Sequence, residues 1–406
     1  MILSEAGKVG ARLRSRWRHY QDARALEPLY SPDPTDVDLD RHLAEALAWI
    51  RRAQDSGTDR GVAYGARFGG EFTESYPETT GYIIQTFVEQ YLITGDADFL
   101  NRAIEMGDWE IAIQMESGAV RGGRMSADAP TPALFNTGMV LLGWCALVQA
   151  TGCDRYKEAA RRAAEWLTDI QEPNGDWIKG HSQFTMPGPG LYRVKVAWGL
   201  CEAGVVLGEP RYLDAGLRNA LFCMAQQHRN GWFPQCCLSD PKRPLLHTLA
   251  YTMQGLVNIG RIMEREDVIR SAGLLADAEI RLMGPDGFLP GRQNASLKGT
   301  TRWCCLTGTA QTSIVWSELF ALTGESRYQH AARRANQYLM RHHDIRNPDD
   351  RLRGGLPGSW PTSGGYRRLE VINWGTKFFI DALSREKVGP TPIVKVPNVQ
   401  RMAVAH

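Results

Sequence analysis

The feature that most constrains this chain is an internal repeat with a period of roughly 56 to 60 residues. Segments of one pattern begin near residues 94, 151, 207, 263 and 323, and they read TGDADFLNRAIEMGDW, TGCDRYKEAARRAAEW, LGEPRYLDAGLRNALF, MEREDVIRSAGLLADA and TGESRYQHAARRANQY. Each segment opens with a short turn and continues as an amphipathic helix rich in alanine and arginine. A fixed period of this length predicts stacked copies of one supersecondary unit.

A second helix-length stretch precedes every short turn and is apolar nearly all round, as in PALFNTGMVLLGWCALVQA and HTLAYTMQGLVNIGRIM. A helix that is apolar all round is a buried helix, so these stretches predict an inner layer and the amphipathic ones an outer layer. The expected inner helices are 78–93, 133–150, 191–206, 245–262, 307–322 and 370–383. The expected outer helices are 38–54, 96–114, 154–170, 210–227, 265–281 and 326–342. Six of each predict an all-α fold, an (α/α)6 barrel or toroid.

We expect one toroid domain over residues 38–385, with an N-terminal extension over 1–37 and a C-terminal tail over 386–406. Hydrophobic residues make up 43% of the chain and charged residues 23%, which is an ordinary balance for a globular protein. One large domain of this length is compatible with a repeat-built toroid.

Charge and hydropathy exclude several classes of partner. The net charge is +2, and no basic block is interleaved with aromatic residues, which argues against nucleic acid. No apolar run approaches the roughly 18 residues of a membrane span, and the polar start MILSEAGKVGARLRSRW is unlike a signal peptide. Cys145, Cys201 and Cys223 lie inside helical patterns, where free buried thiols are expected. These features predict a cytoplasmic protein.

The lengths of the connections predict where a site lies. Inner-to-outer connections are very short, whereas outer-to-inner connections run to about twenty residues, so all long loops meet at one end of the toroid. That end also carries the N-termini of the inner helices, whose free N–H groups and dipoles favour anions. Long loops on a rigid scaffold commonly carry function. We therefore expect an anionic ligand at this end.

The residues expected at that end combine aromatic platforms, arginines, amides and carboxylates, which suits a sugar with an acidic substituent. An anionic saccharide is the predicted substrate. The alternative for Tyr192, Tyr251 and Trp374 is a role as core residues of the inner helices. The candidate substrate-binding residues are Asn136, Arg193, Trp303, Gln311, Tyr366, Asn373, Trp374 and Lys377.

The candidates for proton transfer are Tyr76, His247 and Tyr251. His247 falls on the first turn of an inner helix, and Tyr251 lies four residues later on the same side. The alternative for His247 is packing or capping at the barrel rim. Glu74 is a further catalytic candidate, whereas Glu78, about one turn later, is expected to stabilise the start of the helix.

Two pairs of adjacent cysteines, Cys236–Cys237 and Cys304–Cys305, fall in consecutive long loops. Cys304, Cys305 and His247 are an alternative zinc site, because thiolates and an imidazole from neighbouring loops suit zinc. Neither pair has the CxxC spacing of a typical zinc site, so we expect no metal and no cofactor.

The turn QEPNGDW resembles the Q-x3-G-x-W motif of terpene cyclases, and the toroid of helix pairs resembles (α/α)6 carbohydrate-active enzymes. In the cyclases the motif ties outer helices together, a role that the resemblance implies for Gln171, Gly175 and Trp177. The DxDD motif of squalene-type cyclases is absent, which argues against cyclase chemistry. Unsaturated-glucuronyl hydrolases and acylglucosamine 2-epimerases are similar in length, but their motifs are not found here.

Two short segments resemble the helical domain of glucuronyl C5-epimerases, where E-Y-P-T-T and R-W-x-Y-x-T open two inner helices. The counterparts here are Ser75-Tyr76-Pro77-Glu78-Thr79-Thr80 and Arg302-Trp303-Cys304-Cys305-Leu306-Thr307. The resemblance implies a functional role for Tyr76. The family's catalytic tyrosine in the second segment falls on Cys305, so its proton relay is not preserved.

These observations predict a carbohydrate-active enzyme of the epimerase or lyase type, which removes a proton beside the carboxylate of a uronic-acid-containing saccharide. One alternative is a glycoside hydrolase that uses Glu74, Asp128 or Glu370 as its paired carboxylates. Another is a toroid that binds a glycan or a partner protein within a polysaccharide assembly system without catalysis. That alternative predicts no strongly perturbed titratable group.

Overall fold

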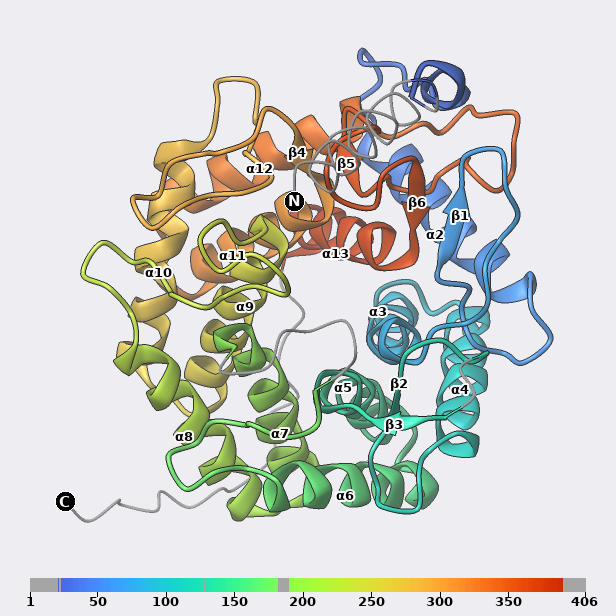
Figure 1. The fold of residues 1–406 in the computed structure, drawn as a ribbon. Coiled ribbons are helices and arrows are strands. Elements are labelled where there is room, and N and C mark those ends of the chain that lie inside the picture. The colour runs from blue at the N-terminus through green and yellow to red at the C-terminus, as the bar shows by residue number, and fades with distance from the viewer. Residues whose placement is uncertain (1–20, 22, 127–128, 182–189, 390–406) are drawn as a thin grey trace, which may run out of the picture.

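The computed structural model describes residues 21, 23–126, 129–181 and 190–389, which form a ring of helix pairs (Figure 1). The described inner helices are α3 (Pro77–Thr94), α5 (Leu134–Thr151), α7 (Val194–Leu207), α9 (Leu246–Ile262), α11 (Leu306–Thr323) and α13 (Asn373–Val388). The described outer helices are α2 (Leu39–Asp55), α4 (Ala97–Ala112), α6 (Asp154–Asp169), α8 (Pro210–Ala225), α10 (Glu266–Leu282) and α12 (Ser326–Arg341). The predicted (α/α)6 toroid is confirmed.

The inner helices close into a ring. Each of α3, α5, α7, α9, α11 and α13 packs against the next, and α13 packs against α3. The outer helix α2 packs against α13, so these two helices form the sixth pair. Helices α3 and α9 therefore lie across the ring from one another. A short turn follows each of α3, α5, α7, α9 and α11, so these five helices begin at the same end of the barrel, which we call the mouth. The start of α13 lies at this end too, because Trp374 lines one cavity with Tyr76 and His247.

Short strands join the long loops at the mouth. β1 (Gly65–Arg67) pairs antiparallel with β6 (Glu370–Ile372). β2 (Arg121–Gly122) pairs with β3 (Thr131–Pro132), and β4 (Cys304–Cys305) pairs with β5 (Ser359–Trp360). The β1–β6 pair joins the first long loop to the last one and so helps to close the ring.

The helix bounds differ from the prediction at three places. The 3-10 turn η2 (Leu191–Arg193) precedes α7, and α13 begins only at Asn373 because the preceding residues form β6. Helix α13 also runs to Val388, beyond the expected domain end at residue 385. In the expected N-terminal extension lies η1 (Glu27–Leu29), and the hydroxyl of Tyr30 donates to the carbonyl oxygen of Gly355 over 2.9 Å. The proposed division into domains stays a prediction.

The glutamine of each repeated turn links neighbouring outer helices. The Gln171 side-chain amide donates to the carbonyl oxygens of Gly175 (3.1 Å) and Ala215 in α8 (3.0 Å). Gln114 and Gln227 make the same two kinds of bond within their own turns and to α6 and α10. These three turns therefore connect α4 to α6, α6 to α8 and α8 to α10, as the resemblance implied for Gln171.

The glycine and tryptophan of the same turn have separate roles. Gly175 has a φ of 92°, and a Cβ atom there would lie 2.6 Å from a carbonyl oxygen of α8. Only glycine fits this left-handed, closely packed position without strain. The buried Trp177 donates from Nε1 to the carbonyl oxygen of Leu167 in α6 over 2.9 Å.

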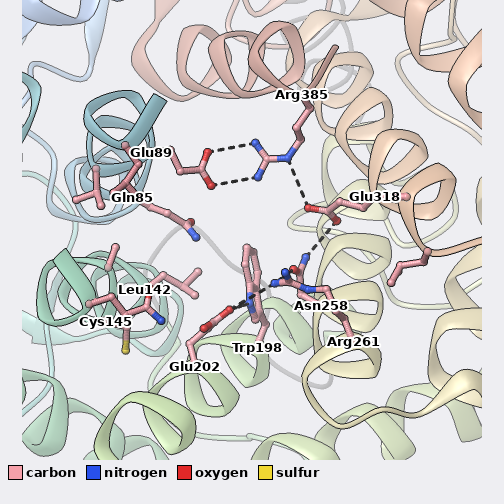
Figure 2. Close-up of a pocket in the computed structure, with 16 residues that line it drawn as sticks. Gln85, Glu89, Leu142, Cys145, Trp198, Glu202, Asn258, Arg261, Glu318 and Arg385 are labelled. Carbon is pink, nitrogen blue, oxygen red and sulfur yellow. Dashed lines mark hydrogen bonds and ion pairs between the residues drawn. The ribbon is translucent and has the colours of Figure 1, made fainter. Parts of the chain in front are cut away.

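The end of the barrel opposite the mouth holds a cavity of about 300 Å³ with an ion-pair network (Figure 2). The Arg385 guanidinium bonds to both carboxylate oxygens of Glu89, at 3.2 and 3.3 Å, and lies 3.7 Å from Glu318. Asn258 donates to the other Glu318 carboxylate oxygen over 3.2 Å, which links α9 to α11. These contacts tie four inner helices together at this end: α3, α9, α11 and α13.

The expectation that no stretch is long and apolar enough to span a membrane is wrong for helix α5. Among the described residues it is the one helix that passes this test of length and composition. However, 78% of the tested window is buried inside the toroid, as in a core helix. The thiols of Cys145, Cys201 and Cys223 are free and buried, as predicted.

Candidate functional site

A cavity of about 260 Å³ opens at the mouth, above the first turns of the inner helices. Its wall is strongly aromatic. Glu78 is the one carboxylate among the described residues that line it. The lining residues are Tyr64, Tyr76, Glu78, Thr79, Tyr82, Arg124, Phe135, Asn136, Tyr192, Leu238, His247, Tyr251, Tyr366, Arg367 and Trp374.

Glu78 lies in the first turn of α3, among the tyrosines of the cavity. Burial raises the pKa of its carboxyl group from 4.5 to about 7, because the charged form loses solvent. The Glu78 carboxyl therefore holds its proton to a higher pH than an exposed glutamate does. The sequence indicated a helix-stabilising role for this carboxylate, but its place in the cavity and its raised pKa suit proton transfer.

His247 reaches the cavity from the first turn of α9 and is 4% exposed. Its ring lies 4.4 Å from the ring of Tyr251 and 5.5 Å from that of Tyr366. Its Nδ1 atom lies 2.5 Å from the Gln311 side-chain oxygen. Burial lowers the pKa of His247 to about 4, against the opposing effect of the Gln311 bond, so the imidazole is neutral at pH 7.

The tyrosines of the cavity are proton donors rather than bases at neutral pH. Burial raises the pKa of Tyr76, Tyr251 and Tyr366, and the nearby Glu78 carboxylate raises each of them further. The Tyr366 hydroxyl accepts a hydrogen bond from Trp374 Nε1 over 2.9 Å, which orients both rings. Phenols of this kind bind hydroxyl and carbonyl oxygens of a ligand.

Two arginines provide positive charge at the mouth. The Arg367 guanidinium lies 4.4 Å from the centre of the Tyr64 ring and bonds to Glu370 over 2.6 Å. Its backbone φ of 45° is unusual for a residue other than glycine, and such conformations cluster at functional sites. Arg124 is 65% exposed and 3.9 Å from Glu74, so its guanidinium is available to an anionic ligand.

The structure brings six of the predicted site residues to this cavity: Tyr76, Asn136, His247, Tyr251, Tyr366 and Trp374. They come from the first, second, fourth and sixth long loops and from the helix starts that follow them. Asn136 is held by a bond from its side-chain nitrogen to the Arg121 carbonyl oxygen, over 2.9 Å.

Six other candidates lie outside the cavity wall. The Glu74 carboxylate accepts bonds from the backbone nitrogen and hydroxyl of Ser126, at 2.7 and 3.0 Å. Gln311 contacts His247 Nδ1 but does not line the cavity. Arg193 is buried and donates to the Trp177 carbonyl oxygen. The Trp303 ring packs on Gly291 and Gly365. The Asn373 amide donates to Ala63 and Thr79, and the Lys377 ammonium pairs with Asp381 over 2.6 Å.

The sequence did not single out Tyr64, Tyr82, Arg124, Phe135 or Leu238, which also line the cavity. A signal was available for four of them, because Tyr64, Arg124 and Leu238 lie in long loops and Phe135 precedes Asn136 on the first turn of α5. Tyr82 lies one turn deeper in α3, where the apolar sequence pattern indicates a core side chain.

The cysteine pairs lie beside this cavity rather than in its wall. The Cys304 sulfur lies 3.1 Å from the Thr309 hydroxyl oxygen. Burial raises the pKa of both the Cys304 and the Cys305 thiol to about 12, so the thiolate that zinc requires is strongly disfavoured. Within the described part of the chain, no three histidine, cysteine or acidic side chains group as metal ligands.

Comparisons with known proteins show similarity at the level of the fold. No family model matches the sequence, and no curated protein matches it. Among solved structures, the chain is similar to an unsaturated glucuronyl hydrolase from Bacillus sp. GL1, with a TM-score of 0.69, 16% identity, and 87% of this chain and 97% of that one covered.

Two sugar isomerising enzymes have a similar structure. A cellobiose 2-epimerase from Bacillus thermoamylovorans B4167 has a TM-score of 0.70 at 10% identity, with 86% of this chain and 98% of that one covered. A D-mannose isomerase has a TM-score of 0.68 at 13% identity, with 88% and 99% covered. These similarities establish the (α/α)6 toroid found in carbohydrate-active enzymes. The resemblance to glucuronyl C5-epimerases gains no support from these three structures.

Proposed function

We propose that this protein is a carbohydrate-active enzyme of the epimerase type, which moves a carbon-bound proton on a saccharide carrying a carboxylate. The observation that carries the proposal is the pairing of Glu78 and His247 in one aromatic cavity. Their pKa values are shifted in opposite directions, to about 7 and about 4. Two titratable groups separated in this way suit the roles of acid and base.

The positions of the two groups suit transfer on opposite faces of a sugar ring. Helices α3 and α9 lie across the ring from one another, so Glu78 and His247 reach the cavity from opposite sides. Neutral His247 takes the proton from the carbon next to the carboxylate, and the bonding electron pair passes into an enolate. Protonated Glu78 then donates its proton to the other face of that carbon. The configuration inverts, and solvent exchange restores both groups.

The enolate carries extra negative charge on the oxygens of the carboxylate, which must be stabilised for the proton to leave. The phenols of Tyr76 and Tyr251 and the guanidinium of Arg124 are available donors in the cavity. The N-termini of the inner helices add favourable potential at the same end. This surplus of donors is our reason for an anionic saccharide. A lyase differs only in that the enolate expels a leaving group.

Two alternatives have less support. A glycosidase of the usual kind needs two carboxylates that flank the bond, but Glu74 bonds to Ser126, Glu370 pairs with Arg367, and neither lines the cavity. Asp128 lies outside the described residues. The non-catalytic reading expects no strongly perturbed titratable group, whereas Glu78 and His247 are both perturbed.

The test uses uronate oligosaccharides and neutral aldoses in deuterated water, with NMR detection of exchange at each carbon. We expect deuterium next to the carboxylate of the uronates, with a second epimer or an unsaturated product. Glu78→Gln and His247→Gln each lower the rate by about 10²–10⁴-fold, whereas the control Glu74→Gln retains most of it. Exchange that survives both cavity variants contradicts the proposed roles, and exchange on neutral sugars alone contradicts the anionic substrate.

A further inference from the structure

A chain of hydrogen bonds runs from His247 into the interior of the barrel and ends at a buried lysine. His247 Nδ1 lies 2.5 Å from Gln311 Oε1, and Gln311 Nε2 donates to Gln254 Oε1 over 3.2 Å. The same Gln254 oxygen accepts a bond from Lys195 Nζ over 2.8 Å. All four side chains are 4% exposed or less. The chain thus connects α9, α11 and α7 behind the wall of the cavity.

The direction of each bond follows from the lysine. An ammonium group has donors only, so it requires the oxygen of the Gln254 amide and not the nitrogen. That oxygen also faces Gln311, which must therefore present its own Nε2 as a donor. The other end of the Gln311 amide is then an oxygen, which accepts a hydrogen bond from His247 only if His247 carries its proton on Nδ1.

The reverse arrangement conflicts with the ammonium. If Gln311 turned its amide nitrogen toward His247, its oxygen would face the oxygen of Gln254. Turning Gln254 as well would bring the Gln254 Nε2 donor against the Lys195 donor. Because the network is buried, water does not relieve such a conflict, and an unmatched donor is costly.

We propose that Lys195 is a positioning residue, which acts through Gln254 and Gln311 to hold His247 as the Nδ1–H tautomer. The lone pair then lies on Nε2, the ring nitrogen on the other side from Gln311, where it serves as the base of the cavity. The catalytic meaning of this inference rests on the proposed function, but the tautomer itself does not.

The aromatic rings around Lys195 favour its cationic form, whereas its burial disfavours that form. Its Nζ atom lies 4.7 Å from the centre of the Trp198 ring and 5.3 Å from the ring centres of Tyr251 and Phe378. Aromatic faces attract cations, most strongly where water is excluded. Burial lowers the Lys195 pKa and Lys377 lowers it further, while Glu318 and Asp381 act in the opposite direction. Lys377 is itself paired with Asp381 over 2.6 Å.

The test is long-range ¹H–¹⁵N NMR of histidine-labelled full-length protein, with His247→Gln identifying the His247 signals. The pattern of cross-peaks distinguishes Nδ1–H from Nε2–H in a neutral imidazole. We expect the Nδ1–H form alone in the unsubstituted protein. Nε2–H as the main form overturns the proposal, and this result requires no Lys195 variant.

Lys195→Met removes the donor but keeps an unbranched side chain, and we expect it to give a mixture of the two tautomers. Lys377→Met, which replaces a buried lysine outside the chain of bonds, is the matched control and leaves the Nδ1–H form in place. An unchanged tautomer in folded Lys195→Met overturns the role of Lys195. The inference and the proposed function can fail separately. The inference is supported if the unsubstituted protein shows the Nδ1–H form and Lys195→Met shows a mixture. The proposed function is refuted if, in the same protein, no saccharide exchanges a carbon-bound proton.

Discussion

Glu78 and His247 begin helices that lie across the ring from one another, and both side chains line the cavity at the mouth. Burial has opposite consequences for the two groups, because it raises the pKa of the carboxyl and lowers that of the imidazole. At neutral pH the cavity therefore contains a carboxyl group that is partly protonated and an imidazole that is free of charge. Both groups start in the state that the proposed reaction requires.

This pairing predicts a bell-shaped pH profile for kcat/KM. Activity rises as pH increases through about 4, where His247 loses its proton and becomes a base. It falls as pH increases through about 7, where Glu78 loses the proton that it donates. Initial rates between pH 3 and 9, on protein shown by circular dichroism to stay folded, check this profile. A rate that keeps rising above pH 8 would contradict Glu78 as the acid.

The partly buried carboxyl group of Glu78 also predicts that the site lowers stability at high pH. The folded state binds the Glu78 proton more tightly than the unfolded state does, so stability falls as pH rises from about 4.5 through about 7. Relative to the unsubstituted protein, Glu78→Gln should gain up to about 3 kcal/mol in unfolding free energy between pH 4.5 and pH 8. Urea unfolding at both pH values measures the gain. The control Glu158→Gln, at a side chain that is 66% exposed, should show little difference.

The repeated turns predict a graded response to alanine. At Gly175 the backbone φ is 92°, and the new Cβ of Gly175→Ala would lie 2.6 Å from a carbonyl oxygen. This substitution should therefore lower the free energy of unfolding by about 3 kcal/mol or more. Gly208→Ala is the matched control, since its φ is 69° and nothing lies within 4 Å of the added atom. It should cost only about 1–2 kcal/mol. Equal losses in chemical denaturation would mean that close packing against α8 contributes nothing.

The cysteines beside the site predict a protein without stoichiometric zinc. Burial raises the pKa of Cys304 and Cys305 to about 12, so binding would have to remove tightly held protons. Elemental analysis of purified protein checks this expectation. About one zinc per chain, lost in Cys304→Ala, Cys305→Ala or His247→Ala, would contradict it and would shift the chemistry toward a Lewis acid.

The helices were predictable from the sequence to within a few residues, apart from the starts of α7 and α13 and the end of α13. Their apolar pattern, as in Leu134–Thr151, follows directly from burial on all sides. The start of α13 was the weakest prediction. Residues 370–372 pair instead with 65–67, and a pairing so distant in sequence leaves no periodic signal.

The composition of the site was harder to predict, because it depends on how the long loops fold. Glu74 and Glu78 are one helical turn apart in the sequence pattern, but the first loop turns Glu74 toward Ser126 and leaves Glu78 in the cavity. Lys377 lies one turn inside α13, so its ammonium reaches Asp381 along the barrel rather than the mouth. The sequence predicts a site at the end of the barrel where this cavity lies, but not which neighbouring side chain lines the cavity.

The most direct test of the account is the incorporation of deuterium from solvent into a uronate saccharide. We predict one deuterium at the carbon that bears the carboxylate, at a rate that falls by about 10²–10⁴-fold in both Glu78→Gln and His247→Gln. The absence of any carbon-bound deuterium across the set of uronates, with folded protein between pH 4 and 7, would contradict the proposed proton transfer.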